Sequence, residues 1–473
     1  MKINWDKILF WLLISVVVTL PLQVTELLFP VHLLGSSFPV LEFSRLLAAV
    51  GISALLIKFL VTRKIFIPKD SLSLVLYVFI AVNGLSLVTF RSHPGLLEVL
   101  RYSFHLSFFL LIVNSVRDTG ALGKIAGAFL LTGLAIALFS IFQYYSGFYL
   151  WNGDLSGWVG SIGQVVNRVN ATFLDPNTLA RFMGIVITFS TAYYAFAATK
   201  WGKFLALFSA NASVAALFFT LSRAGWASFG ISFLALILVI PKNLKIMLFY
   251  TFLLLTSALV YLTSPGVMAR VGNVQYVIEE TATGTAGQYE ILLGSRLQNS
   301  ATGSGSDTGE MRFKEVPDYL GRILTLLPLD ARRLAAIKAG ILMFLNNPLF
   351  GVGIGNFQKS YTTQYSYMIA EPPPNENPVT LSHSSLITLI AELGLVGILW
   401  FSVFLFTLTR VFIRALAKDP HVKFVSLACG ISLLLLILHS QYQGNLFEDP
   451  LFWLLNGILV SGQRISSKEQ SQR

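Results

Sequence analysis

Charged residues are scarce in this sequence, and cysteine is almost absent. Only 12% of the 473 residues are charged, whereas soluble domains carry about 25%. Hydrophobic residues make up 55% of the chain, and the mean hydropathy is +0.69. The single cysteine, Cys429, has no second cysteine with which to form an internal disulfide. These properties exclude a soluble binding module and predict an integral membrane protein.

Apolar runs of about 20 residues recur along the chain, and each can cross the roughly 30 Å hydrocarbon layer of a bilayer. The first run is too long for a signal-peptide core and lacks a small-residue cleavage site, so we interpret it as a membrane span. The predicted fold class is therefore an all-α integral membrane protein with about twelve transmembrane helices. The expected spans are residues 8–29, 38–61, 71–90, 95–114, 120–145, 177–198, 203–221, 223–240, 244–263, 383–409, 421–440 and 448–463.

Basic residues alternate between the two sides of these spans. Connections on one side hold 18 lysines and arginines, whereas the short connections on the other side hold only Arg91, Arg168 and Arg223. Because basic loops remain in the cytoplasm, both termini are expected there. This distribution, rather than nucleic-acid binding, accounts for the net charge of +11.

Four regions follow from this topology: spans 1 to 9 in residues 1–263, a long outer segment at 264–382, spans 10 to 12 in 383–463, and a cytoplasmic tail at 464–473. The outer segment contains a Gly/Ser/Thr-rich piece, residues 281–310, whose composition is typical of flexible chain. Apolar periodicity predicts two short outer helices, an interfacial one over 317–327 and another over 331–346.

Ionisable residues inside the spans gather near their outer ends, where burying charge is costly and marks function. Glu42 and Arg45, like Glu98 and Arg101, are spaced to pair on one helix face. One interpretation is a set of structural ion pairs that tie helices together. The other, which we favour for the set as a whole, is a polar cavity open to the outside. Its expected lining residues are Arg45, Arg101, Asn177, Arg181 and His439.

Several arginines on the outer side suit a diphosphate, because guanidinium groups hold phosphate oxygens bidentately. Arg223 begins a predicted helix, whose dipole adds positive potential. The alternative for Arg223 is an interfacial anchor beside Trp226. Arg332 and Arg333 lie in the first turn of another predicted helix, where they oppose the dipole; the alternative for this pair is binding to anionic lipid headgroups. Arg168 is a further candidate for this group.

His383 begins the tenth predicted span, with Ser382 and Ser384 beside it. A neutral imidazole, with an ordinary pKa of about 6.5, can take a proton from an incoming hydroxyl at neutral pH. The alternative is a structural histidine. No ATP or nucleotide sugar is available outside the cell, so a transferase there needs an activated donor that arrives through the membrane.

The glycines of residues 351–355 (Gly-Val-Gly-Ile-Gly) resemble a dinucleotide fingerprint only superficially, because they follow a helix and Asn-Pro on the outer side. They favour a tight turn or a close backbone approach to a ligand. The outer segments contain neither Asp-x-Asp nor a His/Cys cluster, so we expect no metal, with Glu448 and Asp449 as the one open alternative. No cofactor is indicated.

Four stretches together resemble the O-antigen ligase and polysaccharide polymerase family of bacterial inner membranes. They are Arg168–Asn177, Leu221–Trp226, Arg333–Phe357 and His383–Gly394. The resemblance runs from about residue 165 to 400. The twelve-span topology extends it to the whole chain.

This resemblance implies a GT-C-like helical fold with its active site facing the periplasm, and an inverting, metal-independent glycosyl transfer. The donor would be a glycan on undecaprenyl diphosphate, and the acceptor would be lipid A-core or a second glycan. The family's diphosphate-binding arginines correspond to Arg223 and Arg333, and its catalytic histidine corresponds to His383. Ser384 stands where the family often has asparagine, and Ile337 stands where it often has an aromatic residue.

Ligase and polymerase share this chemistry, and the sequence does not separate them. A transporter for polysaccharide or a small anion is the competing class. A transporter site is expected near the midplane on broken helices, whereas the polar residues of this chain gather on one side.

Overall fold

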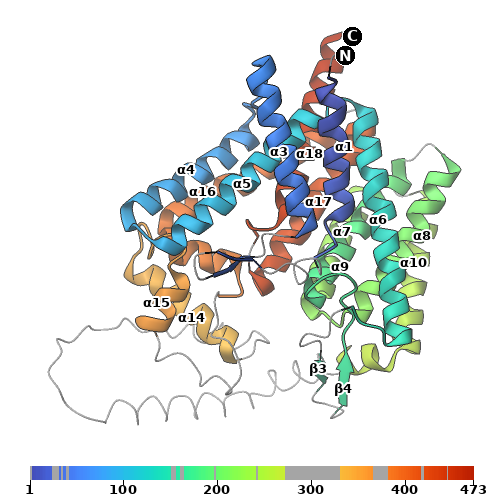
Figure 1. Cartoon of the computed structure of the whole chain (residues 1–473). Coiled ribbons are helices and arrows are strands. Elements are labelled where there is room, and N and C mark those ends of the chain that lie inside the picture. Colours follow the sequence, from blue (N-terminus) through green and yellow to red (C-terminus); the bar gives the residue numbers. More distant parts are fainter. Residues whose placement is uncertain are drawn as a thin grey trace.

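The fold is a bundle of long helices with two short β-hairpins (Figure 1). The computed structural model describes residues 3–23, 31–33, 36–38, 42–150, 156–159, 164–196, 199–240, 243–271, 331–365, 382–416, 420–444 and 446–472. The helices are α1 (Trp5–Thr19), α3 (Phe43–Thr62), α4 (Ser71–Phe90), α5 (His93–Ser115), α6 (Thr119–Ser146), α7 (Pro176–Phe196), α8 (Lys200–Phe219), α9 (Arg223–Val239), α10 (Leu244–Thr263), α14 (Ala331–Asn346), α15 (Phe357–Thr363), α16 (Ser385–Leu416), α17 (Pro420–Gln443) and α18 (Pro450–Gln472). The antiparallel hairpins are β1 (Val31–Leu33) with β2 (Ser36–Phe38), and β3 (Ser156–Val159) with β4 (Gln164–Asn167).

Nine of the helices in the described ranges are long and apolar enough to cross a membrane, so this is a multi-pass membrane protein. The other three predicted spans also coincide with helices, namely α1, α9 and α18. However, α1 and α9 have only 15 and 17 residues, and the second half of α18 carries Arg464 and Lys468. The helical class is confirmed, and the count of twelve spans stays a prediction.

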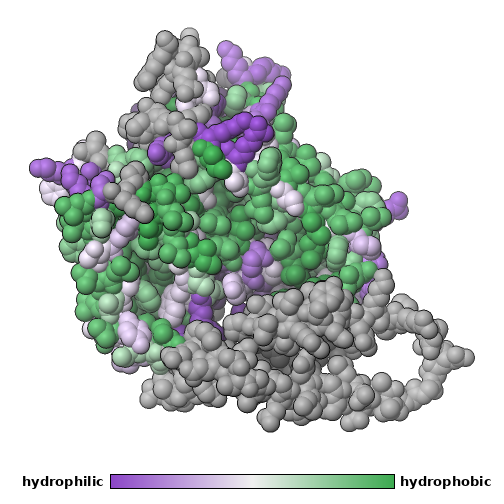
Figure 2. Space-filling view, turned by 180° about the vertical axis from the view of Figure 1, so that it is seen from behind, coloured by the Kyte–Doolittle hydropathy of each residue, from purple (hydrophilic) through white to green (hydrophobic). Residues whose placement is uncertain are grey.

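The outside of the bundle is apolar, as a lipid-facing surface requires. Figure 2 shows a broad hydrophobic band across the face of the molecule that it presents. Large apolar side chains such as Leu238 and Val88 are 79% and 70% exposed. Helices satisfy their own backbone groups in lipid, and in several of them a side chain caps one of the first N–H groups. Asp70, Ser92, Asp118 and Thr199 each accept a hydrogen bond at the start of a helix.

Helices α7 and α17 form the centre of the bundle. They are the most buried of the nine candidate spans, with 72% of each apolar window buried. Helix α17 packs against α7, α9, α16 and α18. Both termini lie at one end of the bundle, which we call the terminal end; the opposite end, formed by α14, α15 and the β3–β4 hairpin, is the distal end (Figure 1). Helix α17 therefore runs through the middle of the molecule and finishes among the distal segments.

Helix α16 is broken at Gly394, which has a left-handed φ of 60°. The glycine-rich loop, residues 348–356, fills the break: the N–H of Val352 donates to the carbonyl of Ala391, and the N–H of Leu395 donates to that of Pro348. A Cβ on Gly351 would lie 2.4 Å from the Ala391 carbonyl oxygen. The tight turn expected from these glycines is confirmed. Gly351 approaches the backbone of α16, whereas Gly355 approaches the backbone of Pro94 and Gly95 at the start of α5.

The first two predicted spans differ from the structure in their bounds. Helix α1 ends at Thr19, and α3 begins at Phe43 instead of residue 38 because residues 31–38 contribute a hairpin. Helix α18 continues to Gln472, through the residues predicted as a tail. Helix α14 matches the helix expected over 331–346. The predicted flexible piece at 281–310 and the short helix at 317–327 lie outside the described residues.

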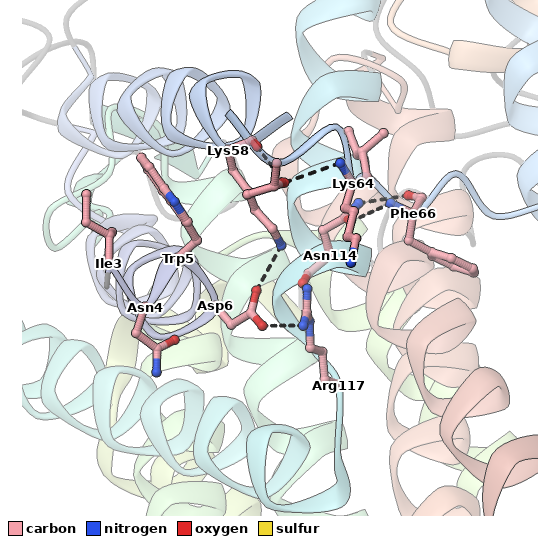
Figure 3. A pocket seen from close by; sticks show the side chains of 11 residues that line it. Ile3, Asn4, Trp5, Asp6, Lys58, Lys64, Phe66, Asn114 and Arg117 are labelled. Carbon is pink, nitrogen blue, oxygen red and sulfur yellow. Dashed lines mark hydrogen bonds and ion pairs between the residues drawn. The ribbon is translucent and has the colours of Figure 1, made fainter. Parts of the chain in front are cut away.

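A cavity of about 630 Å³ opens at the terminal end between α1, the end of α3 and the end of α5 (Figure 3). In it the carboxylate of Asp6 pairs with both Lys58, at 2.8 Å, and Arg117. The side-chain amide of Asn114 donates to the carbonyl of Phe66 and accepts from its N–H, each at 2.9 Å. These bonds fasten the first helix to α3 and α5, at the opposite end from the predicted site.

Replacing Asp6 by asparagine is expected to lower the free energy of unfolding by about 2 kcal/mol. Lys58 is only 7% exposed, and a buried cation without its partner costs more than a surface ion pair contributes. Thermal unfolding in detergent measures the change. Lys64→Gln, in the same cavity, is the control and should shift the midpoint little; equal stability of Asp6→Asn and the wild type would contradict the prediction.

Candidate functional site

Arginines from separate segments converge at the distal end. Arg168 follows β4, Arg223 is the first residue of α9, and Arg333 lies in the first turn of α14. Burial lowers the pKa of the Arg168 guanidinium, and repulsion from Arg333 and Arg223 lowers it further, against the opposing effect of Asp175. The three predicted diphosphate ligands therefore lie within electrostatic reach of one another. The side chain of Arg332 lies outside the described residues.

A fourth member, Arg270, is missing from the sequence-based site. It lies in helical residues 265–271, just beyond the end of α10. Burial, with repulsion from Arg223 and Arg168, lowers its pKa to about 10. One signal for it exists in the sequence: it is a basic residue on the predicted outer side, directly after a span. We call Arg168, Arg223, Arg270 and Arg333 the arginine cluster.

Arg168 is held by the surrounding backbone and side chains. Its Nε donates to the carbonyl of Thr220 at 2.8 Å, and its Nη2 donates to the Oδ1 of Asn177 at 2.8 Å. The same amide oxygen accepts from Ser222 Oγ at 2.7 Å. Ser222 in turn caps α9, accepting from the N–H of Gly225 at 3.1 Å. Asn177, predicted as a cavity-lining residue, thus links Arg168 to the helix start that carries Arg223.

Arg223 is exposed and occupies the N-terminal residue of a helix. The dipole of that helix adds positive potential at the same point. Four guanidinium groups near a helix N-terminus have the chemistry that suits an anion with several oxygens, such as a diphosphate.

The arginine cluster is expected to destabilise the protein until an anion binds. The pKa of Arg270 is lower in the folded than in the unfolded state, so folding weakens proton binding at this guanidinium group. Arg270 stays protonated at every pH below about 10, and the repulsion persists over that whole range. Pyrophosphate should therefore raise the unfolding temperature, by mass action. Arg270→Gln should raise it without ligand and reduce the increase caused by pyrophosphate.

A thermal-shift series from 0 to 10 times the half-saturating concentration of pyrophosphate, with sulfate for comparison, measures both effects. Arg410→Gln, an exposed arginine near the other end of α16, is the control. An unfolding temperature lower in Arg270→Gln than in the wild type, with an undiminished response to pyrophosphate, would contradict the prediction.

His383 lies in a tight turn just before α16, and its φ of 57° is left-handed. Residues other than glycine adopt this conformation at a cost of roughly 1–2 kcal/mol. The neighbouring serines enforce it: Ser382 Oγ donates to the carbonyl of Ser384 at 2.7 Å and accepts from its N–H at 3.1 Å. Strain maintained by its surroundings is common at functional residues.

The last turn of α17 joins the histidine turn to the arginine cluster. Ser384 Oγ donates to Gln441 Oε1 at 2.9 Å. Two residues later on α17, Gln443 Nε2 donates to Asp175 Oδ2, and Asp175 accepts from Asn177 at 3.2 Å. A single helix end therefore carries partners of both the proposed catalytic turn and the segment that holds Arg168.

Ion pairs account for several of the predicted cavity residues. Arg45 pairs with Glu42 at 2.9 Å, and Arg101 pairs with Glu98 at 3.0 Å, which confirms both spacings. Arg181 pairs with Asp449 of the α17–α18 connection at 2.9 Å. These contacts agree with the interpretation of structural pairs that tie helices together.

His439 is fully buried on α17. In the described part of the chain, neither of its ring nitrogens has a hydrogen-bond partner. Arg181 lies close enough to repel its protonated form. Its place is therefore in the packed centre of the bundle.

A cavity of about 330 Å³ opens between α4, α5, the start of α15, α16 and the α17–α18 connection. Glu98, Arg101 and Glu448 line it, together with Ser385, which is two residues after His383. Of the predicted cavity residues, Arg101 lines this cavity, and the arginine cluster does not. A polar cavity is thus present beside the histidine turn, and the arginine cluster lies outside its lining.

Residues 204–402 match the sequence model of a family described as O-antigen ligase. The matched segment contains Arg223, Arg270, Arg333 and His383, and it ends within α16. The resemblance to the O-antigen ligase and polymerase family is thereby confirmed over this segment. A search of curated proteins found no match.

Proposed function

From the match of residues 204–402 to the O-antigen ligase family, we propose that this protein is a membrane glycosyltransferase. It transfers a glycan from undecaprenyl diphosphate to an acceptor hydroxyl. We place the active site at the distal end, on the periplasmic side of a bacterial inner membrane, with both termini in the cytoplasm. The acceptor that we propose is lipid A-core, which makes the enzyme an O-antigen ligase.

The arginine cluster is the observation that carries this proposal. Burial, together with repulsion among the guanidinium groups, lowers the pKa values of Arg168 and Arg270, and a bound anion would offset this repulsion. A membrane-borne diphosphate reaches such a site from the outer leaflet. It also becomes the leaving group, so the arginines stabilise the negative charge that develops as the glycosidic bond breaks.

His383 has the role of general base in this proposal. Its neutral imidazole accepts the proton of the acceptor hydroxyl as that oxygen attacks the anomeric carbon. The bond from the anomeric carbon to the diphosphate oxygen breaks, and its electron pair stays on the diphosphate, between the arginines. Attack opposite the leaving group inverts the anomeric configuration. No metal is required in this scheme because the arginines supply the positive charge.

A transfer assay with the purified full-length protein tests the proposal. A defined undecaprenyl-diphosphate glycan is supplied with lipid A-core, with a second lipid-linked glycan, or with no acceptor. Product on lipid A-core supports a ligase, and elongated lipid-linked product supports a polymerase of the same chemistry. No covalent product with either acceptor, together with movement of intact glycan across sealed vesicles, would overturn the proposal in favour of a transporter.

A further inference from the structure

The cavity beside the histidine turn carries features that the proposed chemistry does not yet use. Its lining combines carboxyl groups, a guanidinium group, hydroxyl groups and aromatic rings. The lining residues include Phe79, Asn83, Glu98, Arg101, Ser385 and Glu448. Its volume of about 330 Å³ lies at the lower end of the roughly 300–1,000 Å³ typical of ligand pockets.

The charges in the cavity are already paired within the protein. Arg101 lies between two carboxylates, 3.0 Å from Glu98 and 2.7 Å from Glu448. Glu392 accepts a hydrogen bond from the N–H of Phe357 at 3.1 Å. A guanidinium at the centre of the carboxylates occupies the place that a bound cation would need, so the cavity suits a neutral ligand with many donors and acceptors.

Two buried oxygens of lining residues lack a hydrogen-bond partner among the described residues, Asn83 Oδ1 and Glu98 Oε2. The side chain of Asn83 is fully buried; its Nδ2 donates to the Phe79 carbonyl at 2.7 Å, but its Oδ1 has no partner among the described residues. A buried amide oxygen without a hydrogen bond is costly. Asn83 lines the cavity, so this unused acceptor belongs to the wall against which a ligand would pack.

Aromatic rings cover the apolar side of the same space. Phe79 packs against Tyr102, Phe447 and Trp400, with ring centroids 5.1, 4.7 and 4.5 Å away. A sugar ring has hydroxyl groups around its rim and C–H groups on its faces, so it matches a pocket that joins carboxyl and amide oxygens to aromatic surfaces.

We propose that this cavity binds one sugar ring of the acceptor, with its hydroxyl groups on Asn83, Glu98, Arg101 and Glu448. The inference rests on the proposed function. The acceptor is favoured over the donor because Ser385 and Thr388 line the cavity, and Thr388 Oγ1 lies 2.9 Å from Ser382 Oγ in the histidine turn. The arginines proposed to hold the donor do not line it.

The test compares two leucine substitutions, each of which removes an asparagine amide from an equivalent buried position. Asn456 is also fully buried, donates through Nδ2 to the carbonyl four residues earlier at 2.8 Å, and has an Oδ1 without a described partner. It does not line the cavity. Asn83→Leu and Asn456→Leu each remove one such oxygen, so a merely structural role predicts the same result for both.

In the transfer assay, Asn83→Leu is expected to raise the KM for the acceptor about 10-fold, as loss of a buried hydrogen bond does. The KM for the donor and the unfolding temperature should stay near the wild-type values. Asn456→Leu should leave both KM values unchanged. An unchanged acceptor KM in Asn83→Leu, or a rise confined to the donor KM, would overturn the assignment.

Direct binding separates this inference from the proposed function. Saturation-transfer NMR with glucose, galactose and N-acetylglucosamine on the full-length protein should detect binding of at least one sugar to the wild type and to Asn456→Leu. That signal should fall at least 5-fold in Asn83→Leu. If the protein binds sugars in this way but has no transferase activity, the proposed sugar site stands and the proposed enzymatic function is refuted. If transfer depends on His383 but Asn83→Leu and Asn456→Leu bind sugars equally well, the enzymatic function stands and the sugar site is refuted.

Discussion

Replacing His383 by alanine should reduce glycan transfer by about 10²–10⁴-fold, the usual contribution of a general base. The acceptor hydroxyl is a poor nucleophile while it retains its proton, and within the proposed mechanism only the imidazole takes that proton. The donor should still bind, because the arginine cluster is unaltered. The rate under saturating donor and acceptor is the quantity to measure.

The left-handed backbone at residue 383 requires a second variant. Asparagine adopts positive φ more readily than other non-glycine residues, so His383→Asn keeps the turn and removes the base. Both variants should lose activity, and His383→Asn should also retain the wild-type unfolding temperature. His93→Ala, an exposed histidine at the start of α5, is the control and should keep full activity. Wild-type rates in His383→Asn would remove this histidine from the mechanism.

Lysine at Arg223 or Arg333 should reduce transfer by about 10²–10³-fold, as loss of one charge-stabilising donor does in other enzymes. The substitution preserves the positive charge but replaces a planar fork with a single ammonium group, which cannot hold two phosphate oxygens in fixed geometry. The loss should appear in kcat more than in the KM for the donor, because the negative charge on the diphosphate grows as the bond breaks.

The two arginines act on one leaving group, so their effects should not be additive. The double variant with lysine at both positions should be less impaired than the product of the single losses. Arg410→Lys, near the opposite end of α16, is the control. Near-normal turnover with lysine at both positions would refute the phosphate role and favour the interfacial alternatives.

The helical architecture could be predicted from the sequence because each apolar run is continuous and each helix satisfies its own backbone. The same holds for Glu42–Arg45 and Glu98–Arg101, whose spacing alone brings the side chains together. Contacts between distant segments carry no such signal. The ion pair between Arg181 and Asp449 joins α7 to the α17–α18 connection, and the sequence around these two residues does not indicate it.

The break in α16 shows why part of the site could not be predicted. Gly394 and Gly397 occupy the same apolar run, and nothing local distinguishes them. Only Gly394 leaves the helix, because the glycine-rich loop supplies hydrogen bonds at that point. Arg270 belongs to the site for a similar reason: its position beside Arg223 and Arg168 follows from tertiary packing.

The same break has a consequence for biogenesis. A helix with unsatisfied peptide groups in its middle enters a bilayer poorly. The segment that covers those groups, residues 348–353, precedes α16 in the chain, so the ribosome makes it first. In the proposed topology it has already crossed the membrane when α16 emerges. The order of synthesis therefore provides the partner before the helix that needs it, and moving this loop to a position after α16 by circular permutation should leave that span stalled during insertion.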